Sequence, residues 1–280
     1  MKIAVVILNW NGRSLMEQFL PSLTQNTQGA DLYVIDNAST DDSCAFLSQH
    51  YPQINQIVLD DNYGFAKGYN LGLKSIEAEL FCLLNNDVAV SENWLIPIKE
   101  AFIEQELSIA QPLILQHKQP ALFEYAGAAG GFIDRYGFPY CRGRIFDTLE
   151  ENKGQYKTAH CFWATGACLF IRRSVWEELE GFDEDFFMHQ EEIDLCWRAF
   201  NKGHRTKCIA TAHVFHLGAA SLKPSPQKTF YNHRNSLWML LKNVPKPQLF
   251  RVIFGRLILD GVAAVRYLLG GQALSFLMVI

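Results

Sequence analysis

Five consecutive apolar residues, Leu80-Phe81-Cys82-Leu83-Leu84, lead directly into three polar ones, Asn85-Asn86-Asp87. A short apolar run with polar residues at its end is typical of a buried strand. In an open α/β sheet, the residues that follow such a strand lie at the carboxyl edge, where ligands bind. A carboxylate at that edge can hold a divalent cation through its oxygen atoms. The stretch therefore predicts a sheet with a metal-binding residue, Asp87, at its edge.

Around this stretch, strand and helix patterns alternate along the first half of the chain. Short apolar runs predict strands, and apolar residues at helical spacing predict helices between them. The predicted strands are 3–8, 31–35, 54–59 and 80–84, and the predicted helices are 14–23, 42–50, 65–76 and 92–105. This order indicates an α/β fold with a Rossmann-like, mostly parallel sheet flanked by helices.

The second half of the chain is less regular. Residues 116–157 are rich in glycine, aromatic and turn residues, which predicts an irregular insertion over the sheet edge. The elements predicted after it are strands at 168–171 and 209–215, helices at 174–179 and 190–201, and a loop at 221–226. The helix at 190–201 is expected to bury one face, formed by Ile193, Cys196, Trp197 and Phe200.

Composition limits the class of protein. The chain has 280 residues, of which 49% are hydrophobic and 19% charged, so a folded core is expected. A net charge of -4 argues against a nucleic-acid partner held by bulk charge. Seven cysteines without any C-x-x-C pair make a disulfide framework or a zinc site improbable. We therefore expect a protein of the reducing cytosol.

The last forty residues differ from the rest and are expected to form a helical extension, 241–280, of a main domain at 1–240. They carry five basic residues and one acid, with apolar residues at helical spacing. Either this helix lies on the inner face of the plasma membrane, or it packs on the domain or on a second copy. In the first case Arg251, Arg256 and Arg266 would face lipid, and Leu257, Leu268 and Phe276 would enter the interface. The apolar end also leaves open that the natural chain continues past Ile280.

Seven motifs occur in a specific order along the chain. They are IAVVILNWNG at 3–12, VIDNASTDDS at 34–43, NYGFAKGYNLG at 62–72, LLNNDV at 83–88, ATGA at 164–167, GFDEDFF at 181–187 and EEIDLCWR at 191–198. Together they resemble glycosyltransferase family 2, which has the GT-A fold, and within it the rhamnosyltransferase-like bacterial members. The resemblance covers residues 1–240.

The resemblance implies that residues at strand ends and in the glycine-rich turn bind the nucleotide: Asn9, Asp36, Asn62, Gly64, Lys67, Asn85, Asn86 and Arg234. Asp36 would accept a hydrogen bond from the imide N–H of uracil or thymine, and Arg234 would clamp the leaving diphosphate. Other readings stay open, because Asp36 also suits a helix N-cap and the glycines suit a tight turn into a helix.

The resemblance also implies a metal site for Mg²⁺ or Mn²⁺ at Asp87 and His216. The family usually carries Asp-x-Asp where this chain has Asn85-Asn86-Asp87. Asn85 keeps an acceptor oxygen but loses a charge, which lowers the expected metal affinity. A neutral imidazole can bind Mn²⁺. Alternatively, Asp87 belongs to a polar turn and His216 is a hydrogen-bonded structural residue, with His213 as a substitute ligand.

The acidic pair Glu191-Glu192 is expected to supply the catalytic base. The second acid of this pair is the base in the family, and here it is Glu192, although Glu191 remains an alternative. Acids in a first helical turn are also common without any catalytic role. Asp194, one turn after Glu191, is expected to support the site. Four residues are assigned to the substrate side: Trp163, Thr165, Gly166 and Asp194.

The sequence thus predicts an inverting, metal-dependent glycosyltransferase of cell-surface polysaccharide synthesis. The donor would be a dTDP- or UDP-sugar, with dTDP-rhamnose favoured by the resemblance, and the acceptor a saccharide or lipid-linked saccharide. One alternative is a sugar-phosphate nucleotidyltransferase, although residues 9–13 lack the glycine- and arginine-rich loop that it needs. The other is a non-catalytic module that binds nucleotide sugars or carbohydrate.

Overall fold

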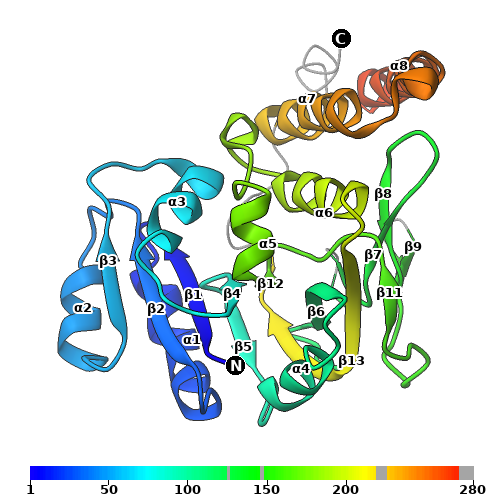
Figure 1. Ribbon diagram of the computed structural model, residues 1–280. Coiled ribbons are helices and arrows are strands. Elements are labelled where there is room, and N and C mark those ends of the chain that lie inside the picture. The colour runs from blue at the N-terminus through cyan, green and yellow to red at the C-terminus, as the bar shows by residue number, and fades with distance from the viewer. Residues whose placement is uncertain (125–126, 146–147, 219–225, 271–280) are drawn as a thin grey trace.

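The computed structural model describes residues 1–124, 127–145, 148–218 and 226–270 (Figure 1). A central mixed sheet carries helices on both faces, and two long helices at the C-terminal end lie over one side of it (Figure 1). Within the described residues the sheet has nine strands in the order β11-β13-β6-β12-β4-β1-β2-β3, with β5 paired to β13.

The first half forms the parallel part of the sheet, as its alternating pattern predicts. Its strands are β1 (Ile3–Asn9), β2 (Asp31–Asp36), β3 (Asn55–Val58) and β4 (Leu80–Leu84). The helices between them are α1 (Arg13–Asn26), α2 (Ser43–His50) and α3 (Gly64–Leu73). Strand β1 sends Ala4 and Val6 into one hydrophobic core and Val5 and Ile7 into the other, on opposite faces of the sheet. Burial on both faces explains its unbroken apolar sequence.

The second half completes the sheet with strands in both directions. These are β5 (Val88–Val90), β6 (Leu107–Gln116), β11 (Ala159–Cys161), β12 (Cys168–Arg172) and β13 (Arg205–His216). Strand β12 runs antiparallel between β4 and β6, while β13 is parallel to β6. The carboxyl ends of β1, β2, β4, β6 and β13 and the start of β12 therefore share one edge.

Helices α4 and α6 each depart from the sequence prediction. Helix α4 (Leu95–Ala101) is shorter than the predicted 92–105, because Ile103 and Glu104 donate to carbonyls only three residues back and end it in turns. Helix α6 (Glu191–Asn201) buries Ile193 and Cys196 as predicted, but Phe200 is 59% exposed. Between β12 and α6 lie α5 (Arg173–Glu178) and the short η1 (Glu184–Phe186).

The predicted irregular insertion contains two small antiparallel hairpins. One pairs β7 (Gly131–Ile133) with β8 (Pro139–Cys141), and the other pairs β9 (Arg144–Ile145) with β10 (Thr148–Leu149). In Figure 1 they stand beside β11 and β13, at the end of the sheet away from α2 and α3.

Two helices follow β13: α7 (Pro226–Asn243) and α8 (Lys246–Leu269), which pack against each other. The expectation that Arg256 faces outward is wrong, because Arg256 is buried and pairs with Asp260. Phe276 and most of the predicted loop at 221–226 lie outside the described residues. No helix in the described part of the chain is long and apolar enough to cross a membrane.

Candidate active site

Three predicted nucleotide-binding residues meet at the carboxyl edge of the sheet. Asn9 ends β1 beside Asp36, which ends β2, and Asn86 follows β4. The Asn9 amide donates from Nδ2 to Asp36 Oδ2 at 3.1 Å and accepts at Oδ1 from Asn86 Nδ2, also at 3.1 Å. A Cβ atom on Gly12 would lie 2.2 Å from Asn9 Oδ1, so only glycine fits against this network.

Asp36 is buried and accepts a second hydrogen bond, at 2.8 Å, from the backbone N–H of Ser39. It does not cap α2, whose first turn follows Asp42 instead. The carboxylate therefore holds the turn after β2 and is joined to Asn86 through the Asn9 amide. Its contact with a pyrimidine ring remains a prediction.

The glycine-rich turn is joined to this edge by Asn37, for which the sequence predicts no role. Asn37 Nδ2 donates to Asn62 Oδ1 at 2.9 Å and to the Gly64 carbonyl at 3.0 Å. Gly64 has φ +73°, and a Cβ there would lie 2.9 Å from the Phe187 ring. The half-exposed Lys67 lies near Glu184, 3.8 Å from its carboxylate. The predicted turn thus contacts the segment that precedes α6.

Asp87 and His216 lie together, as the metal assignment requires. His216 Nε2 is 3.1 Å from Asp87 Oδ1, and the Leu217 N–H donates to the Asp87 carbonyl at 3.0 Å. His216 Nδ1 lies 3.6 Å from Glu124 Oε2, which comes from the irregular insertion. Glu124 could not be predicted from the sequence, because no periodic pattern surrounds it.

The Asp87–His216 pair fits a divalent cation. Ligands of an octahedral cation at about 2.1 Å stand about 3 Å from their neighbours, which matches the spacing of this pair. Burial lowers the pKa of His216, but Asp87 and Glu124 outweigh it and raise that pKa to about 10. A bound cation would take the place of this proton. Across the residues that the structure describes, no group of three or more His, Cys, Asp and Glu side chains is arranged to hold a metal ion.

The two acids at the start of α6 have little contact with water. Glu191 is buried, Glu192 is partly buried, and one carboxylate oxygen of each is buried without a hydrogen-bond partner. Burial raises the pKa of Glu192 to about 7, against the opposing effect of backbone N–H groups nearby. Burial and the neighbouring Glu192 charge raise the pKa of Glu191 well above its usual range. Such a carboxyl group is suited to accept a proton near neutral pH.

Glu192 is linked to the metal pair through the turn before β12. Its Cδ atom lies 3.9 Å from the position of a Cβ on Gly166, and the Phe65 ring lies 3.7 Å from the same point. The next residue, Ala167, accepts at its carbonyl from the N–H of Asn85 at 3.0 Å. Glu192 and Phe65 thus both lie beside Gly166, and the backbone of the next residue is hydrogen-bonded to the start of the Asn85–Asp87 tip.

The other predicted substrate residues have structural partners. Trp163 is buried and donates from Nε1 to the Phe132 carbonyl at 2.7 Å. Thr165 is buried, and its N–H donates to Gln111 Oε1 at 2.9 Å. Asp194 is fully buried and accepts from Arg198 and from two residues of α7, Lys242 and Asn243. Contacts of these three residues with substrate remain predictions.

Helix α7 holds the turn that leads into α6. This turn contains three non-glycine residues with positive φ: Phe187, His189 and Gln190. The buried Asn235 donates from Nδ2 to the carbonyls of Phe186, Met188 and His189 at 2.8–3.1 Å. Arg234 donates to the Asp185 and Phe186 carbonyls and lies over the Trp238 ring. These contacts give Arg234 a part in holding the turn, while its contact with a diphosphate remains a prediction.

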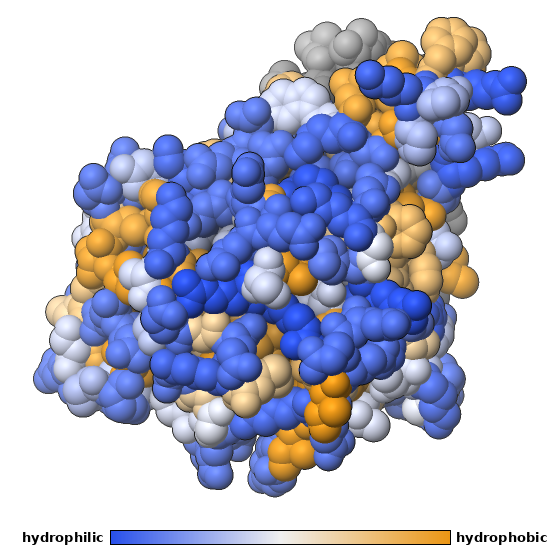
Figure 2. All heavy atoms as spheres, viewed as in Figure 1, coloured by the Kyte–Doolittle hydropathy of each residue, from blue (hydrophilic) through white to orange (hydrophobic). Residues whose placement is uncertain are grey.

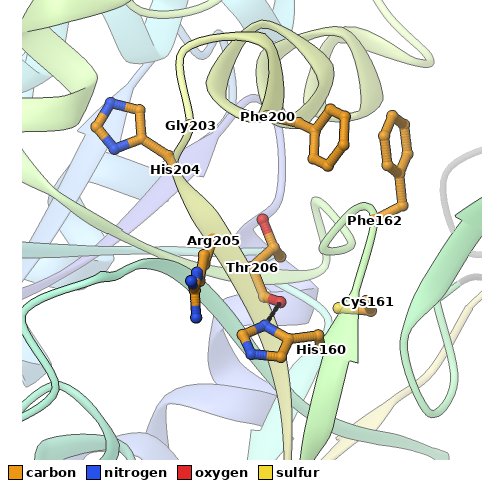
Figure 3. Close-up of a pocket in the computed structure, with 8 residues that line it drawn as sticks. All are labelled: His160, Cys161, Phe162, Phe200, Gly203, His204, Arg205 and Thr206. Atoms are coloured by element: carbon orange, nitrogen blue, oxygen red, sulfur yellow. Dashed lines mark hydrogen bonds between the residues drawn. The ribbon is translucent and has the colours of Figure 1, made fainter.

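A cavity of about 330 Å³ lies elsewhere, at the start of β13 (Figure 3). Its lining includes Phe162, Phe200 and His204, and His160 is hydrogen-bonded there to the Thr206 carbonyl (Figure 3). His216 ends the same strand, eleven residues further on, so the cavity and the candidate site lie at opposite ends of β13.

Comparison with known proteins identifies relatives with related sequences. The chain is 24% identical over 265 residues to the N-acetylglucosaminyl-diphospho-decaprenol L-rhamnosyltransferase of Mycobacterium tuberculosis, covering 85% of this chain and 83% of that one. It is 25% identical over 231 residues to the O-antigen biosynthesis protein RfbC of Myxococcus xanthus, covering 79% of this chain. The chain spans only 18% of the length of RfbC.

Solved structures share the fold. The mannosyltransferase PcManGT from Pyrobaculum calidifontis, in complex with GDP-Man and Mn²⁺, matches with a TM-score of 0.61 at 12% identity, over 98% of this chain and 80% of that one. S. aureus TarS 1-349, in complex with UDP, matches with a TM-score of 0.59 at 16% identity, over 92% and 71%. The predicted GT-A fold is therefore confirmed.

The sequence profile named "Glycosyl transferase family 2" matches residues 4–179, more than half of the chain. This range contains the strand-end residues Asn9, Asp36 and Asp87 and the turn at Gly166. The chain belongs to glycosyl transferase family 2.

Proposed function

We propose that this protein is an inverting glycosyltransferase that moves a sugar from a nucleoside diphosphate to a saccharide hydroxyl. One observation carries the proposal: Glu192, a carboxyl group with a pKa near 7, adjoins the Gly166 turn, which is hydrogen-bonded to the Asn85–Asp87 tip. A general base beside a cation-binding pair supplies the two functions that displacement of a diphosphate requires.

Donor recognition is assigned to the edge formed by β1, β2 and the glycine-rich turn. The Asn9, Asp36 and Asn86 network offers polar groups to a pyrimidine base and ribose, while Asn62 and Gly64 shape the turn beside them. The name of the Mycobacterium tuberculosis relative favours a rhamnosyl donor, for which dTDP-rhamnose is the proposed form, with a UDP-sugar as the other candidate. The donor nucleotides of the solved neighbours, UDP and GDP-Man, support this class of substrate.

Glu192 acts on the acceptor. It removes the proton from the attacking hydroxyl as that oxygen bonds to the anomeric carbon, and the nucleoside diphosphate leaves from the opposite face. A single displacement of this kind inverts the anomeric configuration. Burial and the neighbouring Glu192 charge raise the pKa of Glu191 in turn.

Asp87 and His216 would hold Mg²⁺ or Mn²⁺. The cation, when bound, neutralises the negative charge that builds on the leaving diphosphate. Two protein ligands are enough for this task, because such cations are commonly bound by one or two side chains together with substrate phosphates. The Mn²⁺ in the PcManGT structure supports the assignment.

The acceptor is assigned to cell-surface polysaccharide synthesis. The relatives include a protein of O-antigen biosynthesis and a rhamnosyltransferase named for a lipid diphosphate sugar. A saccharide carried on a lipid diphosphate is therefore the favoured acceptor.

Incubation of the protein with individual UDP- and dTDP-sugars, with Mn²⁺ and with a chelator, tests the proposal. We expect one donor to raise the melting temperature only with the cation, and to release its nucleoside diphosphate slowly to water. Formation of a sugar 1-phosphate and a nucleoside triphosphate when pyrophosphate is added would indicate a nucleotidyltransferase instead. Binding without turnover, even when lipid-linked saccharides are supplied, would indicate a non-catalytic module.

A further inference from the structure

Helix α8 is fixed to the molecule through one face. Arg256 Nε donates to both carboxylate oxygens of Asp260 at 2.9 and 3.0 Å, and Arg256 Nη1 donates to Ser236 Oγ of α7 at 2.6 Å. Asp260 also lies 3.1 Å from His233 Nδ1, and the Arg256 guanidinium lies 3.9 Å from the Phe138 ring centre. The inward face of α8 therefore has its charges paired.

The outward face of the same helix is apolar and exposed. Eight of its side chains are between 49% and 83% exposed: Phe250, Phe254, Leu257, Ile258, Val262, Val265, Leu268 and Leu269. At 100° per residue these positions gather on one side of the helix along most of its length. A continuous apolar stripe of this size on a folded protein marks a surface that another body covers.

The charges around this stripe are of one sign. The exposed ionic residues of α8 are Lys246, Arg251 and Arg266, and its only acid, Asp260, is buried in the pair with Arg256. Residues 241–280 hold five of the 25 basic and one of the 29 acidic residues of the chain. The remaining 240 residues, with 20 basic and 28 acidic side chains, are net negative, so positive charge is concentrated beside the apolar stripe.

We propose that the outward face of α8 docks on the surface of an anionic phospholipid bilayer. An apolar stripe flanked by exposed basic residues is the arrangement that lets a helix lie in the headgroup region. In Figure 2, hydrophobic (orange) and hydrophilic (blue) side chains stand side by side on the helical extension at the upper right. The extension projects from the body there, so a flat surface can reach it (Figure 1).

A second copy of the chain fits this face less well. A two-fold dimer joins the same patch on both copies. It would bring the arginines of two α8 helices together without an exposed acid on either helix to pair with them. Anionic headgroups supply the missing negative charge.

Flotation of the full chain with phospholipid vesicles tests this proposal. We expect binding to vesicles of phosphatidylcholine and phosphatidylglycerol, little binding to phosphatidylcholine alone, and weaker binding at about 1 M salt, where charges are screened beyond about 3 Å. Arg251→Glu with Arg266→Glu should lower the affinity at least about tenfold. Val265→Asp should lower it as well, by opposing insertion of the apolar stripe.

Two variants on the body serve as matched controls. Lys74→Glu changes an exposed lysine at the end of α3, and Ile103→Ser an exposed apolar residue after α4, so both should bind vesicles like the unaltered protein. The proposal fails if the unaltered chain ignores anionic vesicles or binds neutral ones equally well. A salt-resistant dimer that Val265→Asp dissociates, without vesicle binding, would assign the face to a second copy. None of these outcomes depends on glycosyl transfer.

Discussion

At the scale of single residues, the Asp87 carboxylate tests the cation site. Asp87→Asn keeps the shape of the side chain but removes the charge beside His216. We therefore expect the gain in nucleotide affinity caused by Mn²⁺ to fall by on the order of tenfold or more. Titration of UDP or dTDP with and without Mn²⁺ measures this. Asp31→Asn, at the opposite end of the sheet, is the control. An Asp87→Asn protein that still binds nucleotide more tightly in Mn²⁺ would rule out the assignment.

The acidic pair makes stability depend on pH. The folded-state pKa of Glu192 is raised from 4.5 to about 7, and that of Glu191 is also raised. The protonated acids stabilise the folded state relative to their ionised forms. This contribution is fully present below about pH 4.5 and is lost as the pH rises through 7. Glu192→Gln should stabilise the protein at pH 8, by on the order of 2–3 kcal/mol, and much less at pH 5.

Thermal unfolding at the two pH values measures this difference, and Glu106→Gln, an exposed glutamate, provides the control. An equal gain at pH 5 and pH 8 would show that burial does not raise the pKa of the pair.

The residues that the sequence predicts well are those at strand ends. Asn9, Asp36 and Asp87 each follow an apolar run, and the sheet brings such positions to one edge. Glu124 and Asn37 could not be predicted in the same way. Glu124 reaches His216 from a segment without a period, and Asn37 acts by joining two turns that are 25 residues apart.

At the scale of elements, the glycine-rich turn must keep its shape to bind the donor. Gly64 and Gly203 both have positive φ, but only at Gly64 would a Cβ meet another side chain, the Phe187 ring at 2.9 Å. Both alanine variants should lose some stability from backbone strain. Only Gly64→Ala should also weaken donor binding, by about tenfold or more if the clash is worth about 1.4 kcal/mol. Equal donor affinity in the two variants would show that this turn takes no part in binding the nucleotide.

Helix α7 is expected to act on catalysis through the turn before Glu191. Asn235→Ala leaves the carbonyls of Phe186, Met188 and His189 without their donor, which frees a turn held at positive φ. We expect kcat to fall by about tenfold or more, since small misplacement of a catalytic group is costly. Asn232→Ala is the control, because Asn232 contributes its carbonyl, and not its side chain, to Gln190. Equal kcat in both variants would show that Asn235 contributes to the stability of the fold and has no effect on catalysis.

The strands show which elements a sequence can reveal. Strand β4 has the bounds that its five apolar residues predict. Strand β6 was missed, because it is buried along most of its length without alternation and contains Pro112, which argues against a central strand. The structure accommodates Pro112 beside Ile209, where the register of β13 shifts. Such an irregularity depends on the partner strand and leaves no local pattern.

At the scale of the whole molecule, the candidate site is assembled from both halves of the chain. The nucleotide edge comes from β1, β2 and α3, while Glu192 and His216 come from α6 and β13. The alternating pattern of the first half predicts the parallel strands. The antiparallel entry of β12 between β4 and β6 could not be predicted, because pairing of distant strands depends on how the two halves pack.

The central claim is that Glu192 is the base of a glycosyl transfer, and turnover of Glu192→Gln tests it most directly. Nucleotide release should be measured with the preferred donor and an acceptor in Mn²⁺, beside donor affinity. We expect donor affinity to stay unchanged and turnover to fall by roughly 10²–10⁴-fold, the usual contribution of a general base. Glu191→Gln should retain more activity than Glu192→Gln. Unimpaired turnover in Glu192→Gln would contradict the claim.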